Sequence, residues 1–175
     1  KIPNWKVRNS NSHYISSLKQ NFLFNIKYGG ILKDKDSILF KRKIRKMISS
    51  KIDIIITSGA VSAGKFDYVP SVVKKFNLSN YFKGVAIRPG KPILFAKIKG
   101  KQKAIFGLPG NPISSAACFR FFVYPYLQES LGIKKEKSIK AILKNEFSKK
   151  FDFTRFVKSK INTTKNGKLE VEILK

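Results

Sequence analysis

Residues 52–68 of the chain read IDIIITSGAVSAGKFDY, and this stretch decides the expected fold. The largely apolar, β-branched run 52–56 predicts a central strand of a parallel sheet, because such strands are buried on both faces. The loop that follows, Thr57 to Gly64, is built from small residues. Backbone N–H groups in a loop of this kind, placed before a helix, suit an anion and most often a phosphate. The stretch therefore predicts an α/β fold with an anion-binding loop.

Two further loops of similar composition follow predicted strands. They are Arg88-Pro-Gly-Lys-Pro92 and Leu108-Pro-Gly-Asn-Pro112. Ligands of open α/β sheets gather where strands end, so three such loops indicate one polar site. Lys91 stands between two prolines, and a stiffened loop of this kind would hold its charge in place for a phosphate or another oxyanion. A single lysine is otherwise more often a surface residue.

The rest of the pattern predicts the surrounding elements. Helices are expected at about 11–28, at 37–49, shortly after Asp67 and at 112–131, the last one kinked or broken at Pro125. Strands are expected at 30–32, 84–87, 93–97 and 103–106, with a turn at Gly100. Further strands are expected at 139–143, 153–161 and 168–174, the last two joined by a hairpin turn at Asn166-Gly167. We thus expect an α/β domain at 1–132 and the beginning of a small β domain at 133–175.

Composition limits the function classes. The net charge of +27 comes from 37 basic and 10 acidic residues, a balance that suggests nucleic acid. However, 31 of the basic residues are lysines spread along the whole chain, whereas specific readers of nucleic acid favour arginine. We therefore interpret the positive charge as a lysine-rich composition of the solvent-exposed surface, which makes nucleic-acid binding unlikely. The same charge would still favour an anionic small substrate.

The single cysteine, the lengths of the apolar runs and the two ends of the chain give further expectations about location and completeness. Cys118 is the only cysteine, so no internal disulfide can form, and a reducing, cytoplasmic location is expected. We expect Cys118 to be a packed small apolar residue, since His13 is the only possible base. No apolar run is long enough for a membrane span, and no membrane partner is expected. The chain begins with Lys1 and stops within a pattern, so we expect a fragment.

Acidic residues are scarce and can be weighed individually. Asp53 and Glu129 are expected to be structural, because one opens the buried strand and the other ends a helix. Asp34, Asp36 and Asp67 follow predicted strands, where ligands gather. For Asp67, a helix N-cap and a ligand-binding role remain equally open.

Taken in order, the motifs resemble those of the molybdopterin molybdenumtransferase family, which includes MoeA and the E domain of gephyrin. The resemblance rests on Thr57-Ser-Gly-Ala-Val-Ser-Ala-Gly64 with Asp67-Tyr68, on the two Pro-Gly loops, and on the upstream segments 8–11 and 30–34. It covers about residues 7–132. The segment after Gly132 resembles the opening of the family's C-terminal β-barrel domain.

The resemblance implies a fold and an activity. The fold is a three-layer α/β molybdopterin-binding domain of the MoaB/Mog type, here without its N-terminal strand. The activity is the insertion of molybdenum from molybdate into adenylylated molybdopterin, with Mg²⁺ as cofactor and release of AMP. The full-length protein is expected to be a homodimer in which domains of the partner subunit complete the site, so this chain alone is not expected to turn over.

The resemblance also assigns site residues. The substrate-binding set is Ser58, Gly59, Ala60, Val61, Ser62, Gly90, Pro109, Gly110, Asn111 and Pro112. The catalytic set is Asp67, Lys91 and Arg88, and the metal ligands are Asp67 and Asp34. Backbone donors of the 58–62 loop would hold the pterin phosphate, while Lys91 and Arg88 would neutralise molybdate or the pyrophosphate.

Four residues depart from the family pattern. Ala60 replaces a common glycine, Arg88 a lysine, Asn9 an aspartate, and Lys35 an aspartate or asparagine. Three other readings remain. A MogA-type adenylyltransferase shares the fold, but the β segment and the 108–112 motif argue against it. An anchoring role as in gephyrin is untested, and a basic nucleic-acid-binding module would show steep salt dependence.

Overall fold

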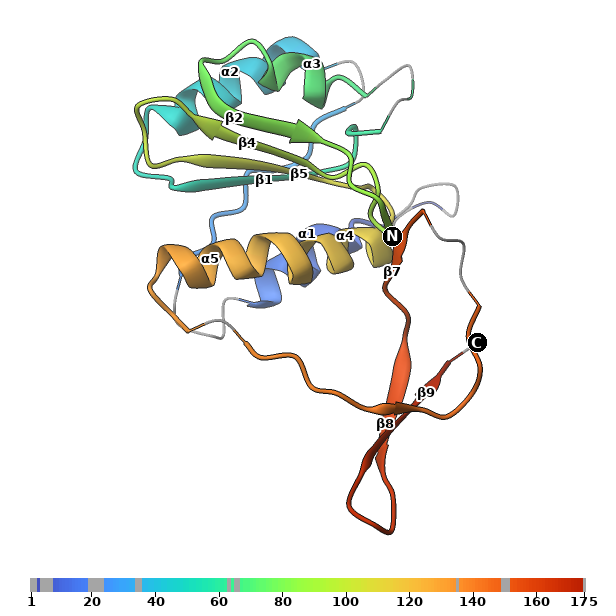
Figure 1. Cartoon of the computed structure of the whole chain (residues 1–175). Helices are drawn as coiled ribbons and strands as arrows, with labels where there is room; N and C mark the ends of the chain where they lie inside the picture. Colours follow the sequence, from blue (N-terminus) through green and yellow to red (C-terminus); the bar gives the residue numbers. More distant parts are fainter. Residues whose placement is uncertain are drawn as a thin grey trace.

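The computed structural model describes residues 3, 8–18, 24–33, 36–62, 64, 67–134, 136–148 and 152–174 of the 175-residue chain. Figure 1 shows a layered α/β part followed by an extended segment and a small β sheet. The elements in chain order are α1 (Ser10–Ser17), α2 (Ser37–Ile48), β1 (Ile54–Ser58), α3 (Val69–Val73), β2 (Leu78–Lys83), β3 (Ile87–Arg88), β4 (Leu94–Ile98), β5 (Ala104–Leu108), α4 (Pro112–Cys118), η2 (Phe119–Val123), α5 (Tyr124–Ser130), β6 (Ile142–Leu143), β7 (Thr154–Arg155), β8 (Ser159–Thr163) and β9 (Leu169–Ile173).

The main sheet has the strand order β1-β5-β4-β2. Strands β1 and β5 are parallel, while β4 is antiparallel to both of its neighbours. The prediction that the 52–56 run forms a central strand is therefore wrong for the described residues, because β1 lies at an edge and β5 is inside. The run is apolar for another reason. Ile55 packs into the core cluster on one face of the sheet, and Ile54 and Ile56 pack against the cluster on the other.

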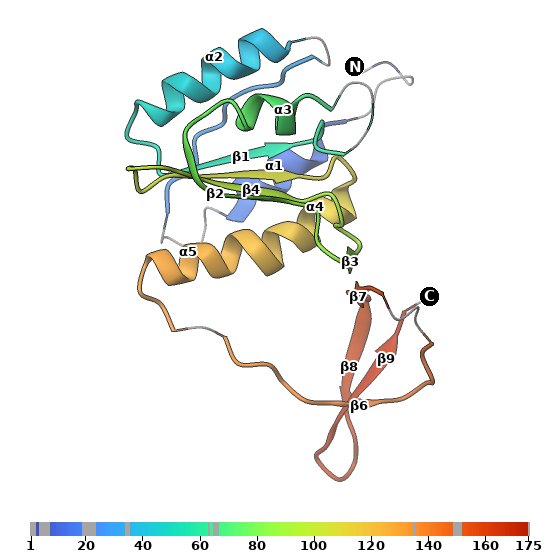
Figure 2. The same cartoon turned by 45° about the horizontal axis from the view of Figure 1, so that its top comes forward.

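Helices cover both faces of this sheet (Figures 1 and 2). On one face, α2 contributes Phe40, Ile44 and Ile48, and α3 contributes Val72 and Val73. The opposite face is covered by α1 and by the continuous helical run α4–η2–α5, whose buried residues include Cys118, Phe119 and Val123. The expected three-layer α/β architecture is thus confirmed.

The first predicted helix is much shorter than expected. It spans Ser10–Ser17, and its N-cap is Asn9, whose side chain accepts a hydrogen bond from the Ser12 N–H at 3.2 Å. Residues 24–33 form neither the rest of that helix nor the strand predicted at 30–32. Ile26 still reaches the core from this irregular segment. An irregular segment can therefore bring an apolar side chain to the core without a helix, and Ile26 is partly buried there.

The structure also corrects the strands that precede β4. Strand β2 was not predicted, because its alternation of apolar and polar residues is interrupted, and its register with β4 shifts between Leu78 and Asn80. The strand expected at 84–87 is reduced to β3. Gly84 has φ +84°, and the Val85 N–H donates to the Lys91 carbonyl at 3.0 Å, so this segment turns instead of continuing as a strand. Strands β4 and β5 and the turn at Gly100 are confirmed.

The helical run after β5 agrees with its prediction. Asn111 caps α4 by accepting from the Ser114 N–H at 3.1 Å, and Pro112 occupies the first turn. The expected distortion at Pro125 is the π-helical turn η2, which ends at Val123. Proline has no N–H to donate, and a π-helical turn is one way in which a helix absorbs the irregularity. Gly132, with φ +66°, follows the end of the run.

The C-terminal segment forms a three-stranded sheet of order β6-β9-β8, in which β8 and β9 are the predicted hairpin. Gly167 in the turn has φ +73°, as the Asn-Gly signal required. The strand predicted at 153–161 is split into β7 and β8, because β7 leaves this sheet and pairs with β3. The three strands do not establish a barrel, and the barrel and the domain division at 132 remain predictions.

Candidate functional site

The ends of β1 and β5 bring two of the predicted loops together. These parallel strands finish in register, with Ser58 opposite Leu108. The Gly59 N–H donates to the Leu108 carbonyl at 2.9 Å, and the Ser58 hydroxyl donates to the Pro109 carbonyl at 3.3 Å. The loop that follows β1 and the loop that follows β5 therefore form one continuous rim, as the sequence predicted for strand ends.

A third segment joins this rim. The side-chain amide of Asn11, in α1, donates to Ser58 Oγ at 2.6 Å and to the Gly110 carbonyl at 2.9 Å. Asparagine at position 11 could also have capped the helix expected from about residue 11, but Asn9 is the N-cap. The contact had one signal in the sequence, since segment 8–11 was among the motifs that carry the family resemblance. Asn11 thus fastens the loops after β1 and β5 to each other.

Close packing shapes the loop after β1. A Cβ atom on Gly110 would lie 3.5 Å from Gly59 Cα, an ordinary van der Waals contact, so the two loops lie side by side here. Ala60 has φ +54°, a conformation that L residues rarely adopt, and its carbonyl accepts from the Val69 N–H at 3.1 Å. Val61 is only 1% exposed, so its side chain belongs to the core. Any contact of Val61 with a ligand is therefore limited to its backbone.

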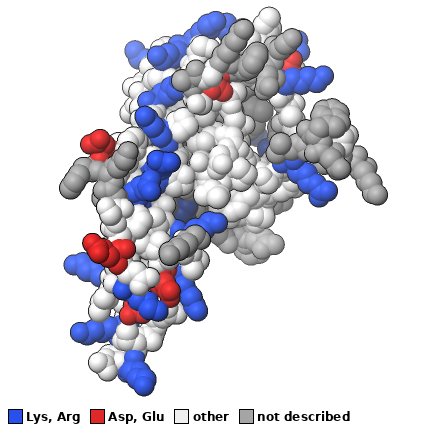
Figure 3. Space-filling model, turned by 90° about the vertical axis from the view of Figure 1, so that its right-hand side faces the viewer, with Lys and Arg blue, Asp and Glu red and all other residues white. Residues whose placement is uncertain are grey.

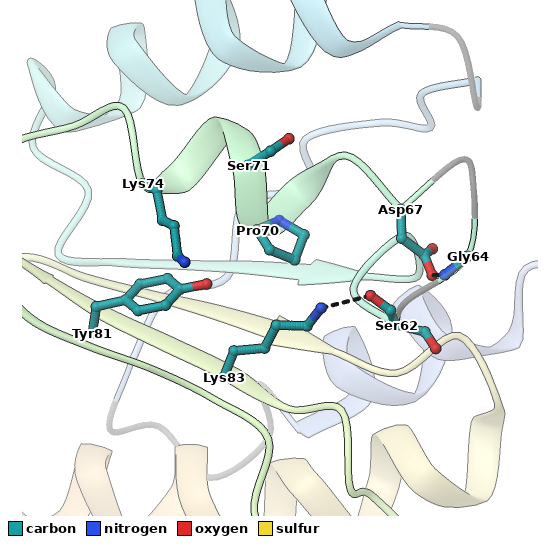
Figure 4. Close-up of a pocket in the computed structure, with 8 residues that line it drawn as sticks. All are labelled: Ser62, Gly64, Asp67, Pro70, Ser71, Lys74, Tyr81 and Lys83. Atoms are coloured by element: carbon teal, nitrogen blue, oxygen red, sulfur yellow. Dashed lines mark hydrogen bonds between the residues drawn. The ribbon is translucent and has the colours of Figure 1, made fainter.

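Asp67 closes the end of the same loop. Its Oδ2 accepts from the Gly64 N–H at 2.8 Å, and its own N–H donates to the Gly64 carbonyl at 3.0 Å. The N-cap residue of α3 is Tyr68, so the interpretation of Asp67 as the N-cap of this helix is wrong. Its ligand-binding role stays a prediction. The carboxylate lines a cavity of about 350 Å³ that Ser62 and Gly64 also line (Figure 4).

Beyond the loop 57–64, five residues of this cavity were not predicted as site residues, namely Pro70, Ser71, Lys74, Tyr81 and Lys83. Lys74 follows α3, and Tyr81 and Lys83 lie on β2. The Lys83 ammonium group donates to the Ser62 carbonyl at 2.7 Å (Figure 4). Tyr81 and Lys83 could not be found without β2, because that strand carries them to the loop. The cavity therefore combines the predicted loop with a basic wall.

The loop at 88–92 is held by different partners. Arg88 is exposed on β3, and Lys91 lies with its ammonium nitrogen 5.4 Å from the ring centroid of Phe153. Gly90 is buried against Cys118, whose thiol donates to the Gly90 carbonyl at 3.4 Å. A Cβ on Gly90 would meet Cys118 Sγ at 2.7 Å, so only glycine fits. Arg88 and Lys91 do not line the cavity beside Asp67.

Cys118 is packed as expected. It is fully buried, and burial raises the pKa of its thiol from 9.0 to about 12. The thiol is therefore protonated near neutral pH and is no nucleophile there.

Of the two predicted metal ligands, Asp34 lies outside the described residues. Within the described ranges, no group of three or more His, Cys, Asp or Glu residues is close enough to hold a metal ion. Asp67 supplies one carboxylate beside two lysines. Magnesium in proteins is often bound by one or two carboxylates and by substrate phosphates. Among the described residues, this single carboxylate fits a Mg²⁺ held mainly by phosphate oxygens.

The basic residues do not form one patch on the face shown in Figure 3. Lys and Arg side chains are scattered there around an area without charge, as expected for a lysine-rich composition of the solvent-exposed surface. No helix in the described parts of the chain has both the length and the apolar character needed to cross a membrane.

The layers and the strand order define a domain of the three-layer α/β class. The family described as "Probable molybdopterin binding domain" matches residues 1–129. The chain therefore belongs to this family. It is 36% identical over 165 residues to the molybdopterin molybdenumtransferase of Staphylococcus aureus (strain COL) and 35% identical over 164 residues to that of Staphylococcus epidermidis (strain RP62A). Each alignment covers 93% of this chain and 38% of the relative, so the chain spans less than half the length of these relatives.

Solved structures give the same result. The moeA protein of Pyrococcus horikoshii aligns with a TM-score of 0.66 and 26% identity, over 95% of this chain and 37% of that one. MoaB of Thermus thermophilus aligns with a TM-score of 0.59 and 17% identity, over 72% of this chain and 84% of that one, and so supports the fold alone. The resemblance to MoeA-type proteins inferred from the motifs is confirmed.

Proposed function

We propose that this chain supplies the molybdopterin-binding part of a molybdopterin molybdenumtransferase, which inserts molybdenum from molybdate into adenylylated molybdopterin and releases AMP. The observation that carries the proposal is the rim in which Asn11 fastens Ser58 to Gly110. Relatives 36% identical to the chain bear the name of this enzyme. Because the chain covers 38% of their length, the complete activity belongs to a longer protein.

In this proposal the rim binds the pterin phosphate. Backbone N–H groups of residues 60–62 and 110 would donate to its oxygens, while the Gly59 N–H, the hydroxyl of Ser58 and the amide of Asn11 would fix the loops around it. Pro109 and Pro112 stiffen the second loop. Preorganised donors of this kind lose little entropy on binding, so affinity does not depend on reordering the loop.

Charge is supplied from two sides. Arg88 and Lys91 would neutralise molybdate or the pyrophosphate, and Cys118 and Phe153 hold their loop in shape. Asp67 would add one carboxylate to Mg²⁺ bound mainly through substrate phosphates, and the ion would screen phosphate charge. The full-length protein would act as a homodimer.

A titration of molybdopterin, and separately of its adenylylated form, tests the proposal. Calorimetry at two salt concentrations should show saturation near one ligand per chain, with binding lost when Ser58 and Asn11 are both replaced by Ala. Steep, salt-sensitive binding of any polyanion, without pterin saturation, would instead support the basic nucleic-acid-binding reading. In the full-length protein, Asp67→Ala and Lys91→Ala should each lower turnover while leaving the unfolding midpoint within a few degrees of the wild type.

A further inference from the structure

The cavity between α3 and β2 has a basic wall that the pterin-binding rim does not use. The rim is formed by the loops after β1 and β5, whereas this wall is formed by Lys74, Tyr81 and Lys83 (Figure 4). The cavity measures about 350 Å³. A water molecule occupies roughly 30 Å³ in the liquid, so this space can hold a small hydrated ion.

Lys83 is placed by a contact that leaves part of its donor capacity for a ligand. Its ammonium group donates one hydrogen bond, to the Ser62 carbonyl at 2.7 Å. An ammonium group has three N–H donors, so two more can serve a ligand in the cavity. The contact also ties the end of β2 to the loop after β1.

Tyr81 contributes a hydroxyl that lacks a protein partner. Its OH is buried and makes no hydrogen bond to another described group. A buried polar group without a partner is costly, and a ligand that accepted its proton would remove that cost. Burial raises the pKa of Tyr81, which keeps the phenol protonated and able to donate.

Lys74 completes the wall. Its ammonium nitrogen lies 5.1 Å from the centroid of the Tyr81 ring. Figure 4 shows the Tyr81 hydroxyl directed into the space that the ammonium groups of Lys74 and Lys83 flank. Asp67 lines the other end of the cavity, where its carboxylate accepts from Gly64. An anion is thus attracted to the end with two ammonium groups and repelled from the end with the carboxylate.

We infer that Lys74, Tyr81 and Lys83 form a binding site for a tetrahedral oxyanion of the phosphate class. The ligand is either free inorganic phosphate or the phosphate group of a nucleotide. The inference rests on the proposed function in one respect, because Ser62 and Asp67 line the same cavity and AMP is the nucleotide that the proposed reaction releases.

Inorganic phosphate, titrated at constant ionic strength into the full chain labelled with ¹⁵N, provides the test. Saturable amide shifts are expected at residues 62, 81 and 83. Lys83→Gln and Lys74→Gln should each weaken phosphate binding about tenfold, and Tyr81→Phe about threefold, as expected for one lost hydrogen bond. Lys75→Gln is the matched control, since it removes the same charge one residue away from the cavity, and it should change binding less than twofold.

A parallel titration with AMP separates the two sources. Tighter binding of AMP than of phosphate, weakened by the same substitutions, would assign the site to a nucleotide phosphate, and equal binding would assign it to free phosphate. Shifts that never saturate, or a Lys75→Gln effect as large as that of Lys83→Gln, would overturn the inference. Titrations of the same variants with molybdopterin distinguish a failure of this inference from a failure of the proposed function. A variant that loses phosphate binding but keeps pterin binding leaves the proposed function standing.

Discussion

The rings of Phe121 and Phe156 stack with their centroids 3.9 Å apart and their planes 8° from parallel. Phe121 belongs to the helical run on the main sheet, and Phe156 follows β7, so the contact joins the C-terminal segment to the α/β part. Beside it, the Thr154 N–H donates to the Ala86 carbonyl at 2.8 Å and the Phe156 N–H to the Arg88 carbonyl at 2.9 Å. The C-terminal segment therefore supports the loop that carries Arg88 and Lys91.

Phe156→Ala should loosen that loop without unfolding the chain. A stacked aromatic pair contributes about 0.5–1.5 kcal/mol beyond its buried area, so the free energy of unfolding should fall by about 1–2 kcal/mol. The local effect should be larger than the global one. Hydrogen exchange at the amides of residues 154 and 156 should accelerate about tenfold, while the amides of β5 keep their protection.

Val157→Ala is the control for this substitution, because Val157 is 41% exposed and has no ring to stack. It should leave exchange at residues 154 and 156 nearly unchanged. If both variants accelerate exchange equally, the stacking does not support the loop.

Asn11→Ala should weaken pterin binding more than it weakens the fold. The amide of Asn11 makes two hydrogen bonds that join α1, Ser58 and the Gly110 carbonyl. Each is worth about 0.5–1.5 kcal/mol, so the rim should lose preorganisation and the dissociation constant for molybdopterin should rise about tenfold. Calorimetric titration measures this change, and thermal unfolding should shift by only a few degrees.

Asn77→Ala is the matched control, since Asn77 is an exposed asparagine that precedes β2, away from the rim. It should bind molybdopterin as the wild type does. Unchanged binding by Asn11→Ala would show that the strand ends hold the two loops without help from α1.

The sequence predicted best where one local signal decided the structure. Asn111 and Pro112 start α4, Gly132 follows the end of α5, and Gly167 turns the hairpin, each because its own chemistry requires that backbone. The convergence of the loops after β1 and β5 was also predictable, because parallel strands end at the same edge of a sheet.

The failures arose where tertiary contacts outweighed local pattern. Strand β2 has a register irregularity and exposed residues, so it lacked a clear strand signal, although it pairs with β4 over most of its length. Without β2, nothing in the sequence could bring Tyr81 and Lys83 to the loop after β1. The split of segment 153–161 likewise depends on β3, a partner more than sixty residues earlier in the chain.

Ala60→Gly should stabilise the chain. Ala60 has φ +54°, a left-handed conformation that costs a residue with a Cβ about 1–2 kcal/mol. Glycine adopts it without strain but loses more entropy on folding, which offsets part of the gain. The free energy of unfolding should therefore rise by about 0.5–1 kcal/mol in denaturant titrations.

Gly59→Ala provides the opposite test in the same loop. Gly59 has φ +89°, and a Cβ there would meet no atom within 4 Å, so only backbone strain would change. This variant should lose about 1 kcal/mol. Destabilisation by Ala60→Gly would contradict the strain argument and would show that the Ala60 methyl group contributes more by packing.

Cys118 should make stability fall at alkaline pH. Burial raises the pKa of its thiol from 9.0 to about 12, so the folded chain holds the thiol proton where the unfolded chain releases it. The stabilisation is complete below pH 9 and is lost as pH rises from 9 towards 12.

Cys118→Ala should cost about 1–2 kcal/mol at pH 8, because it removes a buried sulfur atom that also donates to Gly90. That cost should shrink by about 1.4 kcal/mol by pH 10, since the variant has no thiol to titrate. Denaturant titrations with a reductant at pH 8, 9 and 10 measure the difference between the two proteins, which cancels the titration of lysines common to both. A cost that stays constant over this range would mean that the thiol ionises equally in the folded and unfolded chains.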